Sequence, residues 1–202
     1  MPKDRYIAGI DIGTHAVRVV QVKLDPEGGE PAVIGAVSVP SAGLRRGVIV
    51  DLDEAVSSIS TVLEKVERMT AVPVDSCLVA VGGSHIASLT SKGVIAVSKA
   101  DGEVSEADVV RVIDAAQAVS IPPNREVIHV IPKAFVLDGQ EGIKDPLGMT
   151  GVRLEVDTTI VHGSSPLIKN LHRVASQAGL SVEELVVAPL ASAQAVLSRK
   201  QK

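Results

Sequence analysis

Residues 6–22 read YIAGIDIGTHAVRVVQV, and this stretch decides the fold. Tyr6–Ile12 and Ala16–Val22 are apolar enough to form strands, and the three residues between them are few enough for a tight hairpin. Ala32–Val39 predicts a third strand, after the turn-forming residues 25–29. We therefore expect the chain to begin with an antiparallel meander of three strands.

The turn of this hairpin has the composition of a phosphate-binding turn, Gly9-x-Asp11-x-Gly13-Thr14. Glycine lets the backbone approach a phosphate without a Cβ in the way, and successive amides of the turn can point at the anion. Thr14 adds a hydroxyl donor, and Arg18 on the outgoing strand could reach a phosphate. Asp11 would repel phosphate, so we expect it to hold a Mg²⁺ ion, directly or through its waters. An ordinary hairpin in which Asp11 caps the turn is the alternative that this pattern leaves open.

The segment after the meander predicts a long helix and then a buried strand. Asp51 is an expected N-cap, with Glu54 reaching back to its amide in a capping box. Apolar residues then recur every three or four positions as far as Met69, which gives one stripe facing a sheet, and Val72-Pro73 ends the helix. Cys77–Val81 is a short apolar run typical of a buried strand.

From residue 86 the pattern changes to strand, helix, strand, strand. Ile86–Ser98 holds two short strand-like stretches around residues 90–93, and a capping signal at Ser105 begins a helix that runs to about Val119. Val127–Leu137 and Val152–Val161 predict two long strands.

The last forty residues return to an alternation of helix and strand. We expect a helix over residues 166–178, which Gly179 ends in the left-handed conformation. A strand over Val182–Val187 and a helix from Leu190 follow.

The composition excludes several classes of function. The formal net charge is -4 and the only aromatic residues are Tyr6 and Phe135, so a nucleic-acid surface, which needs positive charge and stacking platforms, is not expected. Cys77 is the only cysteine, which rules out an internal disulfide and favours a reducing cytoplasm. No apolar run reaches the roughly 20 residues of a membrane span. The histidines lack metal-ligand spacing, and Ser84 and His85 would face opposite ways on a strand, so no catalytic residue is predicted.

Five runs of the chain resemble the FtsA family of bacterial cell-division proteins, in the actin and sugar-kinase superfamily. They are GIDIGT at 9–14, VAVGGSHI at 79–86, HVIP at 129–132, the loop at 143–155 and VAPLAS at 187–192. The resemblance implies an α/β fold, an actin-like (ribonuclease H-like) half domain interrupted by a strand-helix-strand-strand (SHS2) insert. Residues 1–84 and 163–202 would form subdomain 1A, truncated before the second half of the core, and residues 85–162 would form subdomain 1C, the insert.

The resemblance also implies cofactors and partners. ATP and Mg²⁺ would be the cofactors, with Asp11, Gly13, Thr14, His15 and Arg18 binding the nucleotide and Asp11 serving the metal; His15 would contribute only its backbone amide. A complete relative would polymerise through contacts with copies of itself and link FtsZ filaments to the inner face of the cell membrane through a C-terminal helix. The insert would contact neighbouring subunits and later division proteins.

On the same resemblance, this chain lacks the second phosphate loop, the adenosine pocket, the FtsZ-binding region and the membrane helix. We therefore expect a fragment of an ATP-binding scaffold with at most weak ATPase activity, and weak or no ATP binding by this chain alone. The alternatives are a pilus-assembly ATPase of the PilM type, a fragment of an ATP-dependent sugar or acetate kinase, and a nucleotide-free interaction module. The loop at 143–155 argues against the first alternative, and the insert at 85–162 argues against the second.

Overall fold

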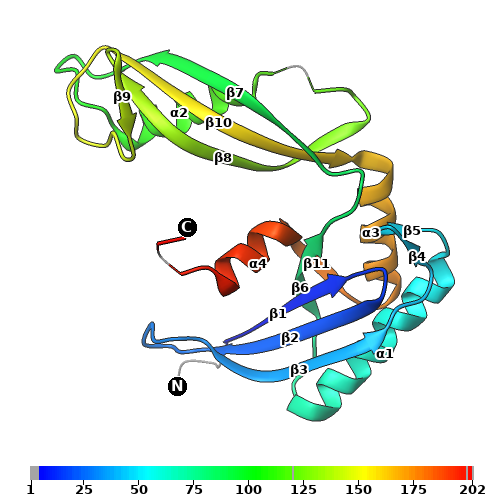
Figure 1. The fold of residues 1–202 in the computed structure, drawn as a ribbon. Coiled ribbons are helices and arrows are strands. Elements are labelled where there is room, and N and C mark those ends of the chain that lie inside the picture. The colour runs from blue at the N-terminus through cyan, green and yellow to red at the C-terminus, as the bar shows by residue number, and fades with distance from the viewer. Residues whose placement is uncertain (1–4, 120, 199, 202) are drawn as a thin grey trace. The chain divides into compact units, whose positions relative to one another are not determined.

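The computed structural model describes residues 5–119, 121–198 and 200–201. It divides into two compact units, which we call the core unit and the insert unit. The core unit combines the chain up to His85 with the chain from Ser165 onward, and the insert unit is Ile86–Ser164. In Figure 1 the core unit therefore carries both ends of the colour scale, and the insert unit is green to yellow.

The core unit is built on a five-stranded sheet in the order β11-β6-β1-β2-β3. The first three strands form the expected antiparallel meander, and β6 and β11 extend the sheet with parallel pairing. Every second residue at the end of β1 and the start of β2 is buried, so one face of the meander packs against the core. The strands are β1 (Arg5–Ile12), β2 (Ala16–Leu24), β3 (Ala32–Pro40), β6 (Ser76–Val81) and β11 (Ser181–Val187).

Helices α1 (Leu52–Thr70) and α3 (Ser165–Gln177) supply the rest of this core. The Asp51 carboxylate caps α1 as expected, by accepting the Glu54 amide at 3.0 Å. The prediction that the Glu54 side chain accepts a hydrogen bond from the Asp51 amide was wrong, because that amide donates to the Gly43 carbonyl instead. The helix ends at Thr70, before Val72-Pro73 as expected, and Ala71 closes it with a left-handed φ of 56°.

The remaining helix of the core unit, α4 (Ala188–Val196), follows β11 directly. It has Pro189 in its first turn, where a missing amide costs no hydrogen bond. None of its residues is buried, although it contacts β11 and β6. The helix begins two residues before the predicted start at Leu190.

A short hairpin that the sequence prediction missed precedes α1. It consists of β4 (Leu44–Arg45) and β5 (Val48–Ile49). Its two turn residues, Arg46 and Gly47, have φ values of 52° and 73°. Positive φ at both central residues is the mark of a type I′ turn, which matches the twist of the strands that it joins.

The insert unit is a four-stranded antiparallel sheet in the order β7-β10-β8-β9, with α2 (Glu106–Gln117) packed on it. The predicted order of strand, helix, strand, strand is present, with the short β9 added before the last strand. The prediction of two strands over residues 86–98 was wrong, because β7 is continuous and pairs with β10 at ten successive positions. The strands are β7 (Ala87–Ala96), β8 (Arg125–Leu137), β9 (Gln140–Ile143) and β10 (Arg153–Ser164).

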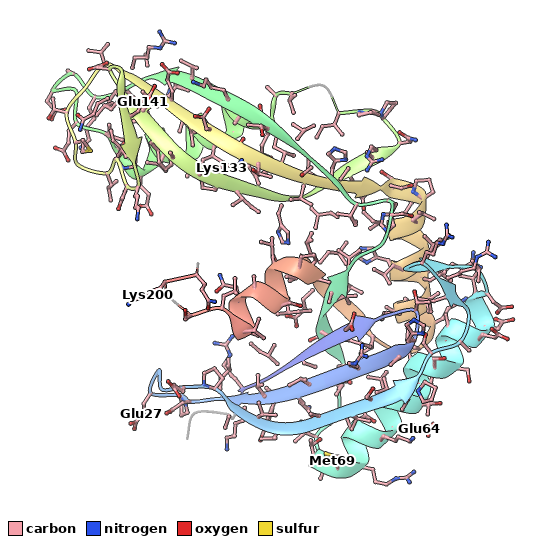
Figure 2. All side chains as sticks on the ribbon, viewed as in Figure 1. Glu27, Glu64, Met69, Lys133, Glu141 and Lys200 are labelled. Atoms are coloured by element: carbon pink, nitrogen blue, oxygen red, sulfur yellow. The ribbon has the colours of Figure 1, made fainter. Side chains whose placement is uncertain are left out.

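Strand β8 bends at a bulge opposite β10. Asp157 pairs with Ala134 and Thr158 pairs with Pro132, which leaves Lys133 as an extra residue with its side chain exposed (Figure 2). Proline donates no backbone hydrogen bond, so a strand tolerates it best at such an irregular position.

A buried carboxylate ties α2 to the strand before it. Asp108 is fully buried and accepts hydrogen bonds from Ser98 and from Ser105, the N-cap of α2, and it pairs with Arg111. These contacts, the Ser105 hydroxyl first, hold the pKa of Asp108 far below its usual range. The predicted capping signal at Ser105 is thus confirmed, and its acidic partner also fixes the end of β7.

Candidate functional site

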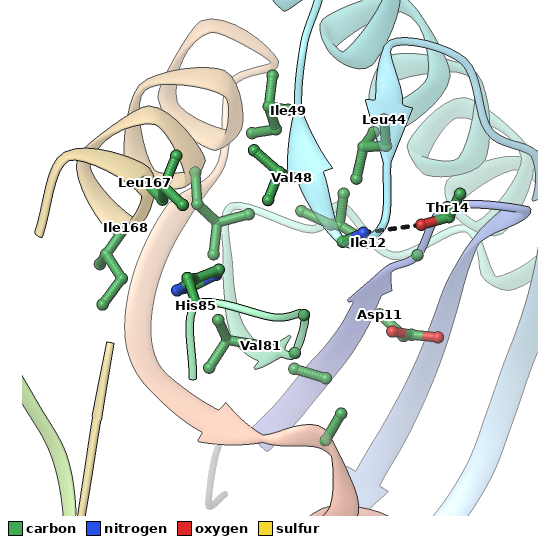
Figure 3. Close-up of a pocket in the computed structure, with 17 residues that line it drawn as sticks. Asp11, Ile12, Thr14, Leu44, Val48, Ile49, Val81, His85, Leu167 and Ile168 are labelled. Atoms are coloured by element: carbon green, nitrogen blue, oxygen red, sulfur yellow. Dashed lines mark hydrogen bonds between the residues drawn. The ribbon is translucent and has the colours of Figure 1, made fainter. Parts of the chain in front are cut away.

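A cavity of about 250 Å³ opens in the core unit beside the β1–β2 turn (Figure 3). Four segments surround it: the turn itself, the β4–β5 hairpin, the loop after β6, and α3. Most of its wall is apolar, and its polar side chains come from Asp11, Thr14 and His85. The lining residues are Asp11, Ile12, Gly13, Thr14, Leu44, Gly47, Val48, Ile49, Ala80, Val81, Gly82, Gly83, His85, Leu167, Ile168, Leu171 and Ala188.

The structure brings only some of the predicted nucleotide-binding residues to this cavity. Asp11, Gly13 and Thr14 line it, whereas His15 is exposed and, like Arg18, is not among the lining residues. The Gly13 amide donates to the Ala16 carbonyl at 3.1 Å and so closes the hairpin. An added Cβ at Gly13 would lie 3.0 Å from that same oxygen, a contact tight enough that the turn favours glycine there.

Arg18 forms an ion pair with Asp11. The two residues are directly opposite each other on β1 and β2, and Arg18 Nη1 lies 3.0 Å from Asp11 Oδ2. Their side chains are 55% and 43% exposed, and pairs of this kind contribute at most about 1 kcal/mol to stability. The predicted contact of Arg18 with a phosphate stays a prediction, because here the guanidinium is held by Asp11. A pair this weak can exchange for a stronger ligand on either side.

The β4–β5 hairpin contributes a contact to the turn that the sequence did not predict. The Gly47 amide donates to Thr14 Oγ1 at 2.8 Å, the dashed line in Figure 3. Gly47 in turn lies against Gly83, since an added Cβ at Gly47 would be 2.8 Å from the Gly83 Cα. The dipeptide Arg46-Gly47, between Leu44-Arg45 and the apolar pair Val48-Ile49, was the available signal, because glycine at such a turn is typical of a two-residue hairpin.

The histidine, cysteine and acidic side chains of the described residues form no metal-ligand cluster, since no group of three or more of them converges as metal ligands would. Cys77 is buried, and burial, with a smaller contribution from Glu183, raises the pKa of its thiol to about 11. No helix in the described ranges is long and apolar enough to cross a membrane.

Comparison with known proteins identifies relatives of both units. Residues 83–162 match the sequence family described as "SHS2 domain inserted in FTSA". Over 202 residues the chain is 39% identical to cell division protein FtsA of Bacillus subtilis strain 168. The aligned region covers 100% of this chain and 46% of that protein. It is 37% identical to FtsA of Pseudomonas aeruginosa over 198 residues, and 31% identical to FtsA of Escherichia coli K12 over 198 residues. The chain spans about half the length of the curated relatives that it matches.

A solved structure shares the fold. The PilM-PilN type IV pilus biogenesis complex contains a chain that matches with a TM-score of 0.61 and 15% sequence identity, over 93% of this chain and 49% of that one. At this identity the likeness concerns the fold alone. With the SHS2 match it confirms the expected mixed α/β, actin-like fold with an SHS2 domain. The sequence similarity to FtsA favours the cell-division family over the PilM type.

Proposed function

We propose that this chain, which is homologous to FtsA along its whole length, is the N-terminal part of a cell-division scaffold of the FtsA type. The observation that carries the proposal is the extent of the similarity, which at 31–39% identity runs through the core unit as well as the insert unit. In this proposal the core unit is subdomain 1A and the insert unit is subdomain 1C.

The site residues fit one half of a nucleotide site. A glycine turn and a threonine hydroxyl border the cavity, and these are groups that cradle phosphate oxygens. Asp11 supplies a half-exposed carboxylate oxygen at the same place, the ligand type that Mg²⁺ takes together with nucleotide phosphates. In the proposal, Thr14 and the backbone of His15 bind phosphate, Arg18 moves between Asp11 and phosphate, and Asp11 serves the ion.

The complete protein would be an ATP-binding scaffold with at most weak ATPase activity. It would polymerise, bind FtsZ filaments through its second half, and attach to the inner face of the cytoplasmic membrane through a C-terminal helix. The insert unit would provide contacts with neighbouring subunits and with later division proteins. These assignments follow from the resemblance to the FtsA family, and the loop at 143–155, in which Leu147 and Val152 are exposed, would offer contact surface for them.

Calorimetric titration with Mg-ATP tests the nucleotide part of this proposal. The full-length protein that contains this chain should bind, its Asp11→Asn variant should bind more weakly in Mg²⁺ than the unchanged protein, and this chain alone should bind weakly or not at all. A full-length protein that binds no Mg-ATP would contradict the proposal. Sedimentation with FtsZ filaments and with phospholipid vesicles tests the scaffold part. A full-length protein that sediments with neither would contradict the scaffold role.

A further inference from the structure

The β4–β5 hairpin is fixed against the loop that follows β6. An added Cβ at Gly83 would lie 3.1 Å from the carbonyl oxygens of Arg46 and Gly47, and one at Gly47 would lie 3.2 Å from the Gly82 carbonyl. Both Gly47 and Gly83 have positive φ, 73° and 109°. Two backbones therefore touch with no space for a side chain, in conformations that glycine alone adopts at little cost. This contact sets the position of the hairpin turn at the edge of the cavity.

The fixed turn delivers one hydrogen-bond donor to the phosphate turn. Gly47 N–H reaches Thr14 Oγ1 at 2.8 Å, across 33 positions of the sequence. A threonine hydroxyl has one proton and two acceptor lone pairs. Since a lone pair of Thr14 faces the Gly47 proton, the hydroxyl proton must point elsewhere. The bond thus selects hydroxyl orientations in which Thr14 is a donor, and a donor is what a phosphate oxygen requires.

We propose that Gly47 is a positioning residue for the phosphate turn. Its amide orients the Thr14 hydroxyl so that the hydroxyl proton is presented to a phosphate oxygen, and its contact with Gly83 holds that amide in place. This inference rests on the proposed nucleotide site. It adds to that site the β4–β5 hairpin, which lies outside the glycine-threonine turn and lines the same cavity with Leu44, Gly47, Val48 and Ile49.

The test compares Mg-ATP affinity among variants of the full-length protein that contains this chain. Thr14→Val, which removes the acceptor and the donor, should bind about tenfold to a hundredfold more weakly, the usual effect of losing a hydrogen bond to a charged group, whereas Thr14→Ser should rescue binding. Gly47→Ala should bind about tenfold more weakly with Thr14 intact, because the displaced amide no longer orients the hydroxyl. Gly28→Ala is the matched control, since Gly28 has φ 82° but no atom within 4 Å of an added Cβ.

Amide hydrogen exchange of this chain, measured by NMR without nucleotide, tests the contact itself. The Gly47 amide should exchange about tenfold faster in Thr14→Val than in the unchanged chain, and Thr14→Ser should restore the slow rate. This measurement also decides the inference if Gly47→Ala does not fold.

The two proposals can fail separately. A full-length protein without Mg-ATP affinity contradicts the proposed function. Affinity that survives Gly47→Ala as fully as it survives Gly28→Ala overturns the positioning role of Gly47, and so does an exchange rate of the Gly47 amide that is the same with and without the Thr14 hydroxyl.

Discussion

Gly93 of β7 lies directly beneath α2, and a methyl group has no space there. An added Cβ would be 2.0 Å from the Val112 carbonyl oxygen, 2.8 Å from the Ala116 amide nitrogen and 3.1 Å from the Ala116 Cβ. Val112 and Ala116 are fully buried in the core of the insert unit, and Ser91 donates to the Ala116 carbonyl at 2.7 Å. In Gly93→Ala the helix must move by about 1.4 Å to restore an ordinary 3.4 Å contact, which disturbs this core and the Ser91 bond together.

The expected cost follows from these contacts. Forcing an extra methyl group into a packed core costs about 1 to 3 kcal/mol, and the rigid backbone atoms met here place Gly93→Ala at the upper end. Replacing glycine with alanine stabilises the fold by about 0.5 to 1 kcal/mol, because it lowers the conformational entropy of the unfolded chain. The net loss in the free energy of unfolding is therefore about 2 kcal/mol, or roughly 8 to 16 °C in the unfolding temperature of a unit of this size.

Differential scanning calorimetry of the chain measures this loss, and hydrogen exchange assigns it to α2. Gly9→Ala is the matched control, because Gly9 lies in a strand, has no positive φ and has no atom within 4 Å of an added Cβ. The control should unfold within about 1 kcal/mol of the unchanged chain. Unfolding of Gly93→Ala at the same temperature as Gly9→Ala would refute the close packing of α2 on β7.

Three further predictions concern buried titratable groups. Burial, and then the charge of Arg125, lower the pKa of His162, so the imidazole takes up a proton more readily in the unfolded chain than in the folded one. The free energy of unfolding should therefore fall as the pH drops below 6.5. Urea titrations should show that this pH dependence is lost in His162→Gln. Asp108→Asn should lower the unfolding temperature of the insert unit, and Asp114→Asn on the exposed side of α2 should not, as thermal scans will report. Cys77, 1% exposed and with a pKa raised to about 11, should react with a disulfide reagent only after unfolding in urea.

The sequence predicts the elements whose pattern is long and local. The β1–β2 hairpin and the stripe of α1 are examples, since each repeats its apolar period over several residues. The sequence did not predict the β4–β5 hairpin, because two-residue strands are too short to show an apolar period. The polar residues 90–93 suggested a break in β7, yet the strand continues because β10 pairs with it along its whole length. Whether such a segment forms a strand depends on the segments that lie beside it in the fold, and the local sequence pattern does not contain them.

The same distinction applies to the site. The phosphate turn is visible in the sequence because glycine, aspartate and threonine lie within six residues, and the structure places three of its predicted members at the cavity. The donor to Thr14 comes from Gly47, and the position of Gly47 depends on Gly83. Two contacts between distant segments therefore complete the turn, and a glycine in a sequence does not tell which backbone it will touch.

The size and lining of the cavity limit what this chain can recognise by itself. Its volume of about 250 Å³ falls below the roughly 300 to 1,000 Å³ of most ligand sites, and beyond the phosphate turn its wall is largely aliphatic. Neither aromatic residue lines it: Phe135 is in the core of the insert unit, and Tyr6 is at the far end of β1 from Asp11. Stacking on a purine is thus not available from this wall, and in the proposed site its polar groups would contact only the phosphates and their cation. Any binding by this chain alone should therefore be indifferent to the base, with equal affinities for Mg-ATP and Mg-GTP in calorimetric titrations. A clear preference of this chain for Mg-ATP over Mg-GTP would show that the base is recognised by residues outside the cavity.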